Sequence, residues 1–114
     1  MRPITVSTSD ASSADVESDW VFFDAYAFAP ISIQVSVTDS ATYTVYSTLD
    51  DPNDPTNPVA EGDMVWVAAS TALTDANSSL QGSFTSIPKY AKIVQTDGTG
   101  SCRATFIQPA NVPF

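Results

Sequence analysis

The chain has 114 residues and a formal net charge of −9, with 43% hydrophobic and 15% charged residues. It has no histidine and one cysteine, Cys102, which excludes imidazole proton transfer, histidine metal ligands and an internal disulfide. The length suits one domain, and the acidity argues against binding to nucleic-acid phosphates.

The N-terminal residues predict a short strand and a polar arm. Residues 2–7 favour an extended strand, whereas residues 8–19 are polar and acidic and lack the apolar run of a secretory signal. We therefore expect a single β-sandwich domain over residues 1–114 with an N-terminal polar arm at about 1–19. No apolar stretch is long enough to cross a bilayer, so no membrane partner is expected.

The next strands carry a register conflict. After a short strand at 20–23, residues 31–38 and 41–48 alternate apolar and polar side chains, which predicts two half-buried strands. A two-residue hairpin at Asp39-Ser40 would split their apolar side chains between two faces, because a one-residue slip flips every side chain. Either the loop has an odd length, or the two strands belong to opposite sheets, as happens in jelly rolls.

The middle of the chain contains a proline-rich loop. Residues 50–58 place prolines at 52, 55 and 58, a spacing that favours a stiff, extended surface segment. Short strands are expected at 64–69 and 82–85, separated by a polar stretch that has room for one helical turn.

A C-terminal hairpin is the clearest unit. Residues 89–96 and 101–108 alternate on either side of an Asp97-Gly98 turn, and Asp-Gly is a strong hairpin signal. One face of this hairpin would hold the side chains of Ala91, Ile93, Cys102, Ala104 and Phe106.

About eight short strands, frequent turn signals and no convincing helix predict an all-β fold. We expect a two-sheet antiparallel sandwich with jelly-roll connectivity. An immunoglobulin-like sandwich is the alternative, because strand order does not follow from strand count.

The acidic part of the proline-rich loop is a candidate cation site. Asp50, Asp51, Asn53 and Asp54 offer the oxygen ligands that calcium prefers. The loop lacks the glycine and the terminal glutamate of an EF-hand, so we interpret these residues as turn formers that bond their own backbone. No metal or cofactor is expected.

The aromatic residues allow two interpretations. Trp20 and Trp66 could form a sugar-stacking platform, but large aromatic side chains in a small sandwich usually fill the core. The serines are accompanied by no Gly-x-Ser-x-Gly elbow and no base. We therefore expect no catalytic residue and no enzymatic activity.

The cations gather at the C-terminal end. Lys89, Lys92 and Arg103 are three of the four basic residues, and the predicted hairpin places Lys92 and Arg103 on one face. Such a basic face could steer docking to an acidic partner or a second copy; the alternative is scattered solubilising charge.

The chain also resembles small virion proteins of tailed bacteriophages. The resemblance covers roughly residues 31–108 and rests on the following segments: Ala41-Thr42-Tyr43-Thr44-Val45, Leu-Asp-Asp-Pro-Asn-Asp-Pro at 49–55, Pro-x-Tyr-Ala-Lys-Ile at 88–93, Gly-Thr-Gly-Ser at 98–101 and Ala-Thr-Phe-Ile-Gln at 104–108. Within that group it is most similar to jelly-roll capsid decoration, or cement, proteins.

The resemblance implies a structural protein that is made in the bacterial cytoplasm and sits on the outer capsid surface. Its partners would be the major capsid protein and copies of itself, as a dimer or trimer, and its role would be to stabilise contacts between capsid subunits. The expected docking elements are the arm, the 50–58 loop and the basic face, with the candidate residues Arg2, Ile4, Asp51, Asn53, Asp54, Lys89, Lys92 and Arg103.

Two other functions remain open. A head–tail connector or tail accessory protein could share the fold and differ in copy number. A carbohydrate-binding module would use Trp20 or Trp66.

Overall fold

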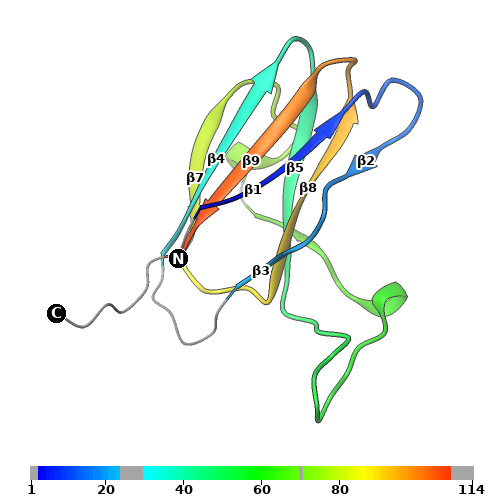
Figure 1. Cartoon of the computed structure of the whole chain (residues 1–114), viewed down its shortest axis with the longest axis vertical. Coiled ribbons are helices and arrows are strands. Elements are labelled where there is room, and N and C mark those ends of the chain that lie inside the picture. The colour runs from blue at the N-terminus through cyan, green and yellow to red at the C-terminus, as the bar shows by residue number, and fades with distance from the viewer. Residues whose placement is uncertain (1–2, 24–29, 70, 109–114) are drawn as a thin grey trace, which may run out of the picture.

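The computed structural model describes residues 3–23, 30–69 and 71–108. Within these ranges the chain is all-β, and two antiparallel sheets pack against each other (Figure 1). The four-stranded sheet has the order β1-β9-β4-β7, and the five-stranded sheet has the order β2-β8-β5-β6, with β3 also paired to β8.

The elements follow the alternating segments of the sequence. The four-stranded sheet consists of β1 (Ile4–Ser9), β4 (Ile31–Thr38), β7 (Leu80–Phe84) and β9 (Ser101–Ile107). The five-stranded sheet consists of β2 (Val16–Glu17), β3 (Val21–Phe22), β5 (Thr42–Thr48), β6 (Val67–Ala68) and β8 (Tyr90–Asp97). Two single 3₁₀ turns, η1 (Glu61–Asp63) and η2 (Thr71–Leu73), complete the described elements, and η2 supplies the short turn expected between the middle strands.

The strand order is that of a jelly roll. If β2 and β3 are taken as two pieces of one strand along β8, each sheet holds four strands and the chain passes repeatedly between the sheets. An immunoglobulin-like sandwich pairs its first two strands within one sheet, whereas β1 and β2 lie in opposite sheets here. The jelly-roll prediction is therefore confirmed over its immunoglobulin-like alternative.

The register conflict between β4 and β5 is resolved by a sheet crossing. β4 pairs with β7 and β9, whereas β5 pairs with β6 and β8. The apolar side chains of both strands thus face one core from opposite sides, which is one of the two solutions that the sequence pattern left open.

The predicted C-terminal hairpin is wrong. β8 pairs with β5, and β9 pairs with β1 and β4, so the two strands lie in different sheets. The Asp97-Gly98 signal does mark a turn, but this turn is a corner between the layers. Ala91 and Phe106 are both fully buried, because they face the same core from the two sheets.

Close packing of two turns explains this corner. Gly98 has a φ of +97°, and a Cβ built there would lie 2.1 Å from the carbonyl oxygen of Ser40. A Cβ on Gly100 would lie 2.2 Å from the carbonyl oxygen of Thr38. The Gly100 N–H donates to the Ser40 carbonyl at 2.8 Å, so the turn after β8 is fixed to the turn after β4.

The core lies between the sheets. Its largest fully buried side chains include Tyr43, Phe23, Phe106 and Ile33, and the rings of Phe23 and Phe106 meet edge to face at 5.8 Å. Cys102 is fully buried, and burial raises the pKa of its thiol. The prediction of a small buried hydrophobe at this position is confirmed.

The expected N-terminal arm is part of the sandwich. β1 pairs with β9 at six successive positions, from Ile4 opposite Phe106 to Ser9 opposite Ser101. The backbone N–H of Ser18, just after β2, donates to the Ile93 carbonyl at 2.9 Å. The polar composition of residues 8–19 indicated an arm, but this stretch makes the crossing between the two sheets.

Candidate docking surfaces

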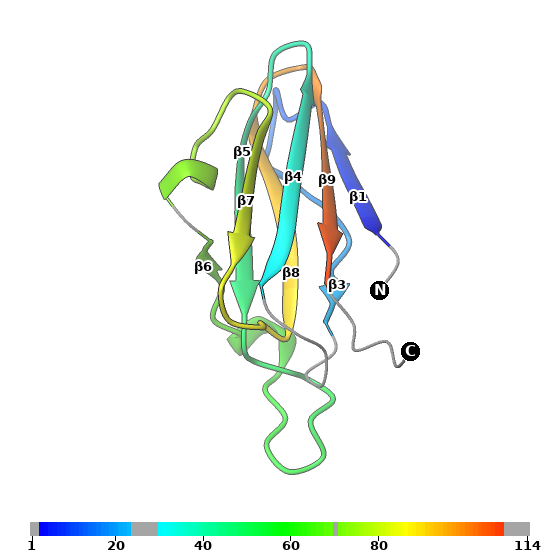
Figure 2. The same cartoon turned by 90° about the vertical axis from the view of Figure 1, so that its left-hand side faces the viewer.

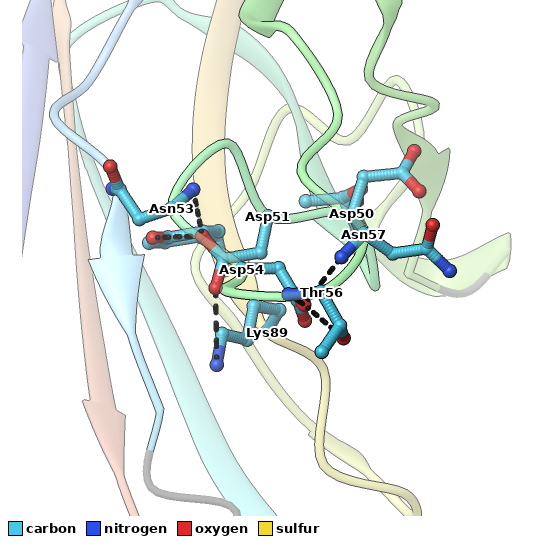
Figure 3. Close-up of polar contacts among 9 residues, drawn as sticks. Asp50, Asp51, Asn53, Asp54, Thr56, Asn57 and Lys89 are labelled. Atoms are coloured by element: carbon cyan, nitrogen blue, oxygen red, sulfur yellow. Dashed lines mark hydrogen bonds and ion pairs between the residues drawn. The ribbon is translucent and has the colours of Figure 1, made fainter.

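Asp51 attaches the proline-rich loop to β8. Its Oδ1 accepts hydrogen bonds from the Asn53 N–H at 2.9 Å and from the Tyr90 hydroxyl at 3.1 Å, and its Oδ2 lies 3.3 Å from Lys89 Nζ (Figure 3). The Asn53 N–H, together with Lys89 and Tyr90, holds the pKa of the Asp51 carboxyl below its usual value. Asp51 is buried at 9% exposure, so it joins two elements and leaves little surface for a partner.

The remaining carboxylates of the loop bond to nearby backbone. Asp54 Oδ1 accepts from the Thr56 N–H, the Thr56 hydroxyl and the Asn57 N–H at 2.9–3.0 Å (Figure 3), and these bonds lower the pKa of its carboxyl. Asp50 Oδ2 accepts from the Val65 N–H at 2.7 Å. The prediction of turn-forming side chains is confirmed for Asp51 and Asp54, whereas Asp50 bonds to a backbone N–H fifteen positions away. No group of three or more Asp, Glu, Cys or His in the described ranges is placed to hold a metal ion.

Aromatic rings and lysines form a strip on the outer face of the five-stranded sheet. Trp20 lies 5.1 Å from the Trp66 ring and 5.4 Å from the Tyr90 ring, and Phe22 lies 5.6 Å from Tyr90. Lys89 Nζ lies 5.0 Å from the centroid of Phe22. We call Trp20, Phe22, Trp66, Lys89, Tyr90 and Lys92 the aromatic strip.

Lys92 is enclosed within the aromatic strip. It is only 9% exposed, forms an ion pair with Glu17, and places its Nζ 4.3 Å from the centroid of Trp66. Because one ring face of Trp66 is covered by this cation, that face is not free to stack on a sugar. The interpretation of the aromatics as core filler holds for Tyr43, whereas Trp20 and Trp66 lie half-buried outside the core.

The predicted basic face does not exist. Lys89 and Lys92 belong to the outer side of the five-stranded sheet, whereas Arg103 on β9 belongs to the outer side of the four-stranded sheet. This error follows from the wrong hairpin, because the two strands that carry the cations lie in different layers. Both lysines are paired with carboxylates, whereas Arg103 is exposed and has no ion pair within the described part of the chain.

The two N-terminal candidates do not form a docking element. Ile4 is partly buried and packs against the core, so it stabilises β1 and is not presented to a partner. Arg2 lies outside the described residues. Asn53 and Asp54 remain on the proline-rich loop, which extends beyond the ends of the strands (Figure 2).

The outer face of the four-stranded sheet has a uniform composition. Cross-strand pairing places its outward side chains in four rows: Ser9, Ser101 and Thr38; Ser7, Arg103 and Ser36; Thr5, Thr105, Gln34 and Gln81; Ile107, Ser32 and Ser83. Neighbours on adjacent strands bond within the third row, Thr5 Oγ1 to Thr105 Oγ1 at 3.2 Å and Gln81 Nε2 to Gln34 Oε1 at 2.8 Å. None of these side chains is a carboxylate, although the chain has thirteen acidic residues. We call this surface the hydroxyl face.

The hydroxyl face was not recognised from the sequence as a site. Its Ser, Thr and Gln residues occupy alternate positions of β1, β4 and β9 and were visible as the polar half of each strand. Only the strand order brings them onto one surface, because β1, β4 and β9 are distant in sequence and adjacent in space.

The hydroxyl face contains a recess around Arg103. A hollow of about 510 Å³ is lined by Arg103 and in part by Ser7, Ser9, Ser36 and Ser101. The short serine side chains leave this space because they do not fill the volume next to a long arginine.

A second cleft opens at the edge between β6 and β7. It has a volume of about 510 Å³ and is lined by apolar side chains that include Val65, Val67, Phe84 and Ile87. Leu49 at its rim is 80% exposed and Val67 is 59% exposed, so the sandwich is less completely covered here than elsewhere.

In the described residues no helix is both long and apolar enough to cross a membrane. Comparison with protein-family models gives no match, and comparison with curated proteins gives no match either.

Proposed function

We propose that this chain is a non-enzymatic structural protein of a bacteriophage particle, which binds the outer capsid surface and stabilises contacts between capsid subunits. The resemblance of residues 31–108 to small virion proteins supports the kind of particle. The jelly-roll strand order agrees with the decoration proteins to which the chain is most similar.

The observation that carries the proposal is the hydroxyl face. A chain with a net charge of −9 repels other acidic proteins over most of its surface, because like charges brought together cost free energy. The hydroxyl face carries Arg103 and no carboxylate, so a protein partner can approach it without that cost.

The shape and chemistry of this face suit a protein partner. Apart from Arg103 and Ile107, the four rows consist of Ser, Thr and Gln side chains, which offer hydroxyl and amide groups for hydrogen bonds. Each contact can be modest, since many copies on a symmetric shell act together.

The opposite side of the sandwich has fewer free groups. In the aromatic strip, Lys89 and Lys92 are already paired with Asp51 and Glu17, and the rings pack on one another. We therefore place the capsid contact on the hydroxyl face, on the side of the sandwich opposite the aromatic strip.

The test is the copy number of this polypeptide in gradient-purified particles, measured by quantitative mass spectrometry. A number equal to that of the major capsid protein, or a simple fraction of it, is expected for a decoration protein. Absence from the particles contradicts the proposal.

The nearest alternative is a head–tail connector or tail accessory protein. A ring at a portal or tail would contribute about a dozen copies or fewer, set by its symmetry, so the same measurement separates the two roles. The geometry gives no comparable support to a carbohydrate-binding module, because Trp66 is covered by Lys92 and packed against Trp20.

A further inference from the structure

We infer that the recess around Arg103 receives a carboxylate side chain of the partner protein, and that this contact fixes the position of the chain on the particle. The inference rests on the proposed function, because it names the chemistry of the partner at the hydroxyl face.

Three strands of the four-stranded sheet form most of the recess, and Val16 of β2 completes its lining. Arg103 on β9 lies opposite Ser7 on β1 and opposite Ser36 on β4. In the next row, Ser101 lies between Ser9 and Thr38. The guanidinium is therefore flanked on both sides by short hydroxyl side chains, and hydroxyls donate hydrogen bonds to an anion.

Charge distribution makes Arg103 unusual in this chain. The two described lysines each have a carboxylate partner, Asp51 for Lys89 and Glu17 for Lys92. Arg103 has no ion pair among the residues that the structure describes, and it is exposed. Its cross-strand neighbours are serines, so no carboxylate in its row competes for the guanidinium.

The nearest carboxylates along β1 and β4 belong to turns at the strand ends. Asp10 follows β1, and its Oδ1 accepts from the Ser12 N–H and hydroxyl at 3.4 and 2.7 Å. Asp39 follows β4 in the adjacent turn. These two carboxylates border the face and disfavour an anion that approaches from the turns, so a ligand is expected to arrive from above the sheet.

A protein carboxylate fits this recess best. A guanidinium binds a carboxylate through two parallel N–H···O bonds, which adds orientation as well as affinity. Phosphate would satisfy the same donors, but a chain with net charge −9 is repelled by a nucleic-acid backbone. Charge complementarity therefore assigns the recess to an acidic side chain on a protein.

The first experiment measures binding of the purified full chain to particles that lack it. We expect Arg103→Glu to weaken the apparent affinity by about tenfold or more, because it replaces attraction with repulsion at the contact. Arg103→Lys keeps the charge but loses the two-pronged geometry, so an intermediate loss is expected. Ser7→Asp places a carboxylate beside the guanidinium and should also reduce binding.

A matched control separates the recess from general charge effects. Asn77→Asp makes the same change of charge as Ser7→Asp at an exposed position in the connection before β7, away from the four rows. We expect this variant to bind within about twofold of the unchanged chain, since distant exposed charges are screened at physiological salt. Equal losses for Ser7→Asp and Asn77→Asp, or unchanged binding by Arg103→Glu, would overturn the inference.

A second experiment tests the recess without particles. Sodium acetate is titrated into the ¹⁵N-labelled chain at constant ionic strength against sodium chloride, and the Arg103 side-chain Nε–H signal is followed by NMR. We expect a saturable shift with acetate that is absent with chloride, and no comparable shift at Ser7 in the Arg103→Gln variant.

The two experiments distinguish the two proposals. If the chain is absent from particles but acetate shifts the Arg103 signal, the proposed function fails and the recess stands as a carboxylate site. If the chain binds particles and Arg103→Glu binds equally well, the proposed function stands and the recess inference fails. Lack of any acetate-specific shift also contradicts the inference.

Discussion

The Thr8 hydroxyl on β1 donates a 2.9 Å hydrogen bond to the side-chain oxygen of Gln95 on β8, and so joins the two sheets inside the protein. Gln95 is fully buried, and its amide nitrogen donates to the carbonyls of Gly98 and Gly100 at 3.1 and 3.0 Å. A single glutamine therefore ties the edge of one sheet to the corner between β8 and β9.

Removal of this glutamine should destabilise the fold. We expect Gln95→Leu to lower the free energy of unfolding by about 1–3 kcal/mol, because the buried Thr8 hydroxyl loses its partner. Thr8→Val should cost about 1 kcal/mol. The double variant should cost less than the sum of the two, since replacing both partners with apolar groups leaves no orphaned hydroxyl. Urea denaturation of the unchanged chain, the two single variants and the double variant measures this coupling. Strictly additive losses of unfolding free energy would contradict it.

The corner glycines provide a second test. Gly98→Ala introduces a Cβ at a φ of +97° and 2.1 Å from the Ser40 carbonyl oxygen. We expect the free energy of unfolding to fall by about 2 kcal/mol or more, since both backbone strain and overpacking oppose the change. Gly62→Ala is the matched control, because nothing lies within 4 Å of the added atom. Thermal melts should separate the two variants clearly; equal melting temperatures would show that the turns are not held together.

Acid should weaken the attachment of the proline-rich loop. The pKa of Asp51 is lowered in the folded protein, so the folded state binds fewer protons than the unfolded state near the usual carboxyl pKa of about 3.9. The stability from Asp51 is therefore fully present above that value and is lost as the pH falls below about 4 through the folded pKa. Asp51→Asn should reduce this acid-induced loss in a measured plot of the free energy of unfolding against pH. Asp15→Asn makes the same charge change at an exposed position, and this variant should lose stability in acid as the unchanged chain does.

The aromatic strip is expected to stabilise the sheet without binding the particle. Trp66→Ala should lower the free energy of unfolding by about 2 kcal/mol, because a half-buried indole loses contact with Trp20 and Lys92. Affinity for particles should change less than in Arg103→Glu. If Trp66→Ala abolishes binding in a chain that remains folded by circular dichroism, the docking surface lies on the five-stranded sheet instead.

The positions of the strands along the chain could be predicted from the sequence better than their partners. The register conflict across Asp39-Ser40 predicted opposite sheets for two strands as one of two solutions, and β4 and β5 occupy them. The Asp97-Gly98 signal led to an error because turn propensity is local, whereas pairing depends on which strands compete for an edge. The sequence of residues 89–108 alone does not indicate that Gly98 and Gly100 pack against Ser40 and Thr38.

The candidate site was predictable only in part. Charge and the predicted hairpin indicate Arg103 as a docking residue, but they group it with Lys92, which the structure places on the other side of the sandwich. Its actual neighbours, Ser7 and Ser36, are ninety-six and sixty-seven positions away in sequence. Cross-strand neighbours at such distances follow from topology, which composition and alternation do not encode.

The hydrogen-bonded corner and the proline-rich loop lie at opposite ends of the strands, and the two ends differ in how well they should tolerate an inserted peptide. At the corner, Gly98 and Gly100 are closely packed against the neighbouring turn, and any inserted peptide would separate the sheets. The loop extends beyond the strands (Figure 2), and Asn57 and Pro58 are exposed, at the end of the turn that Asp54 closes. A foreign peptide placed between Asn57 and Pro58 should therefore be tolerated. Under the proposed function, such an insertion would make the chain a carrier for peptides on a particle surface.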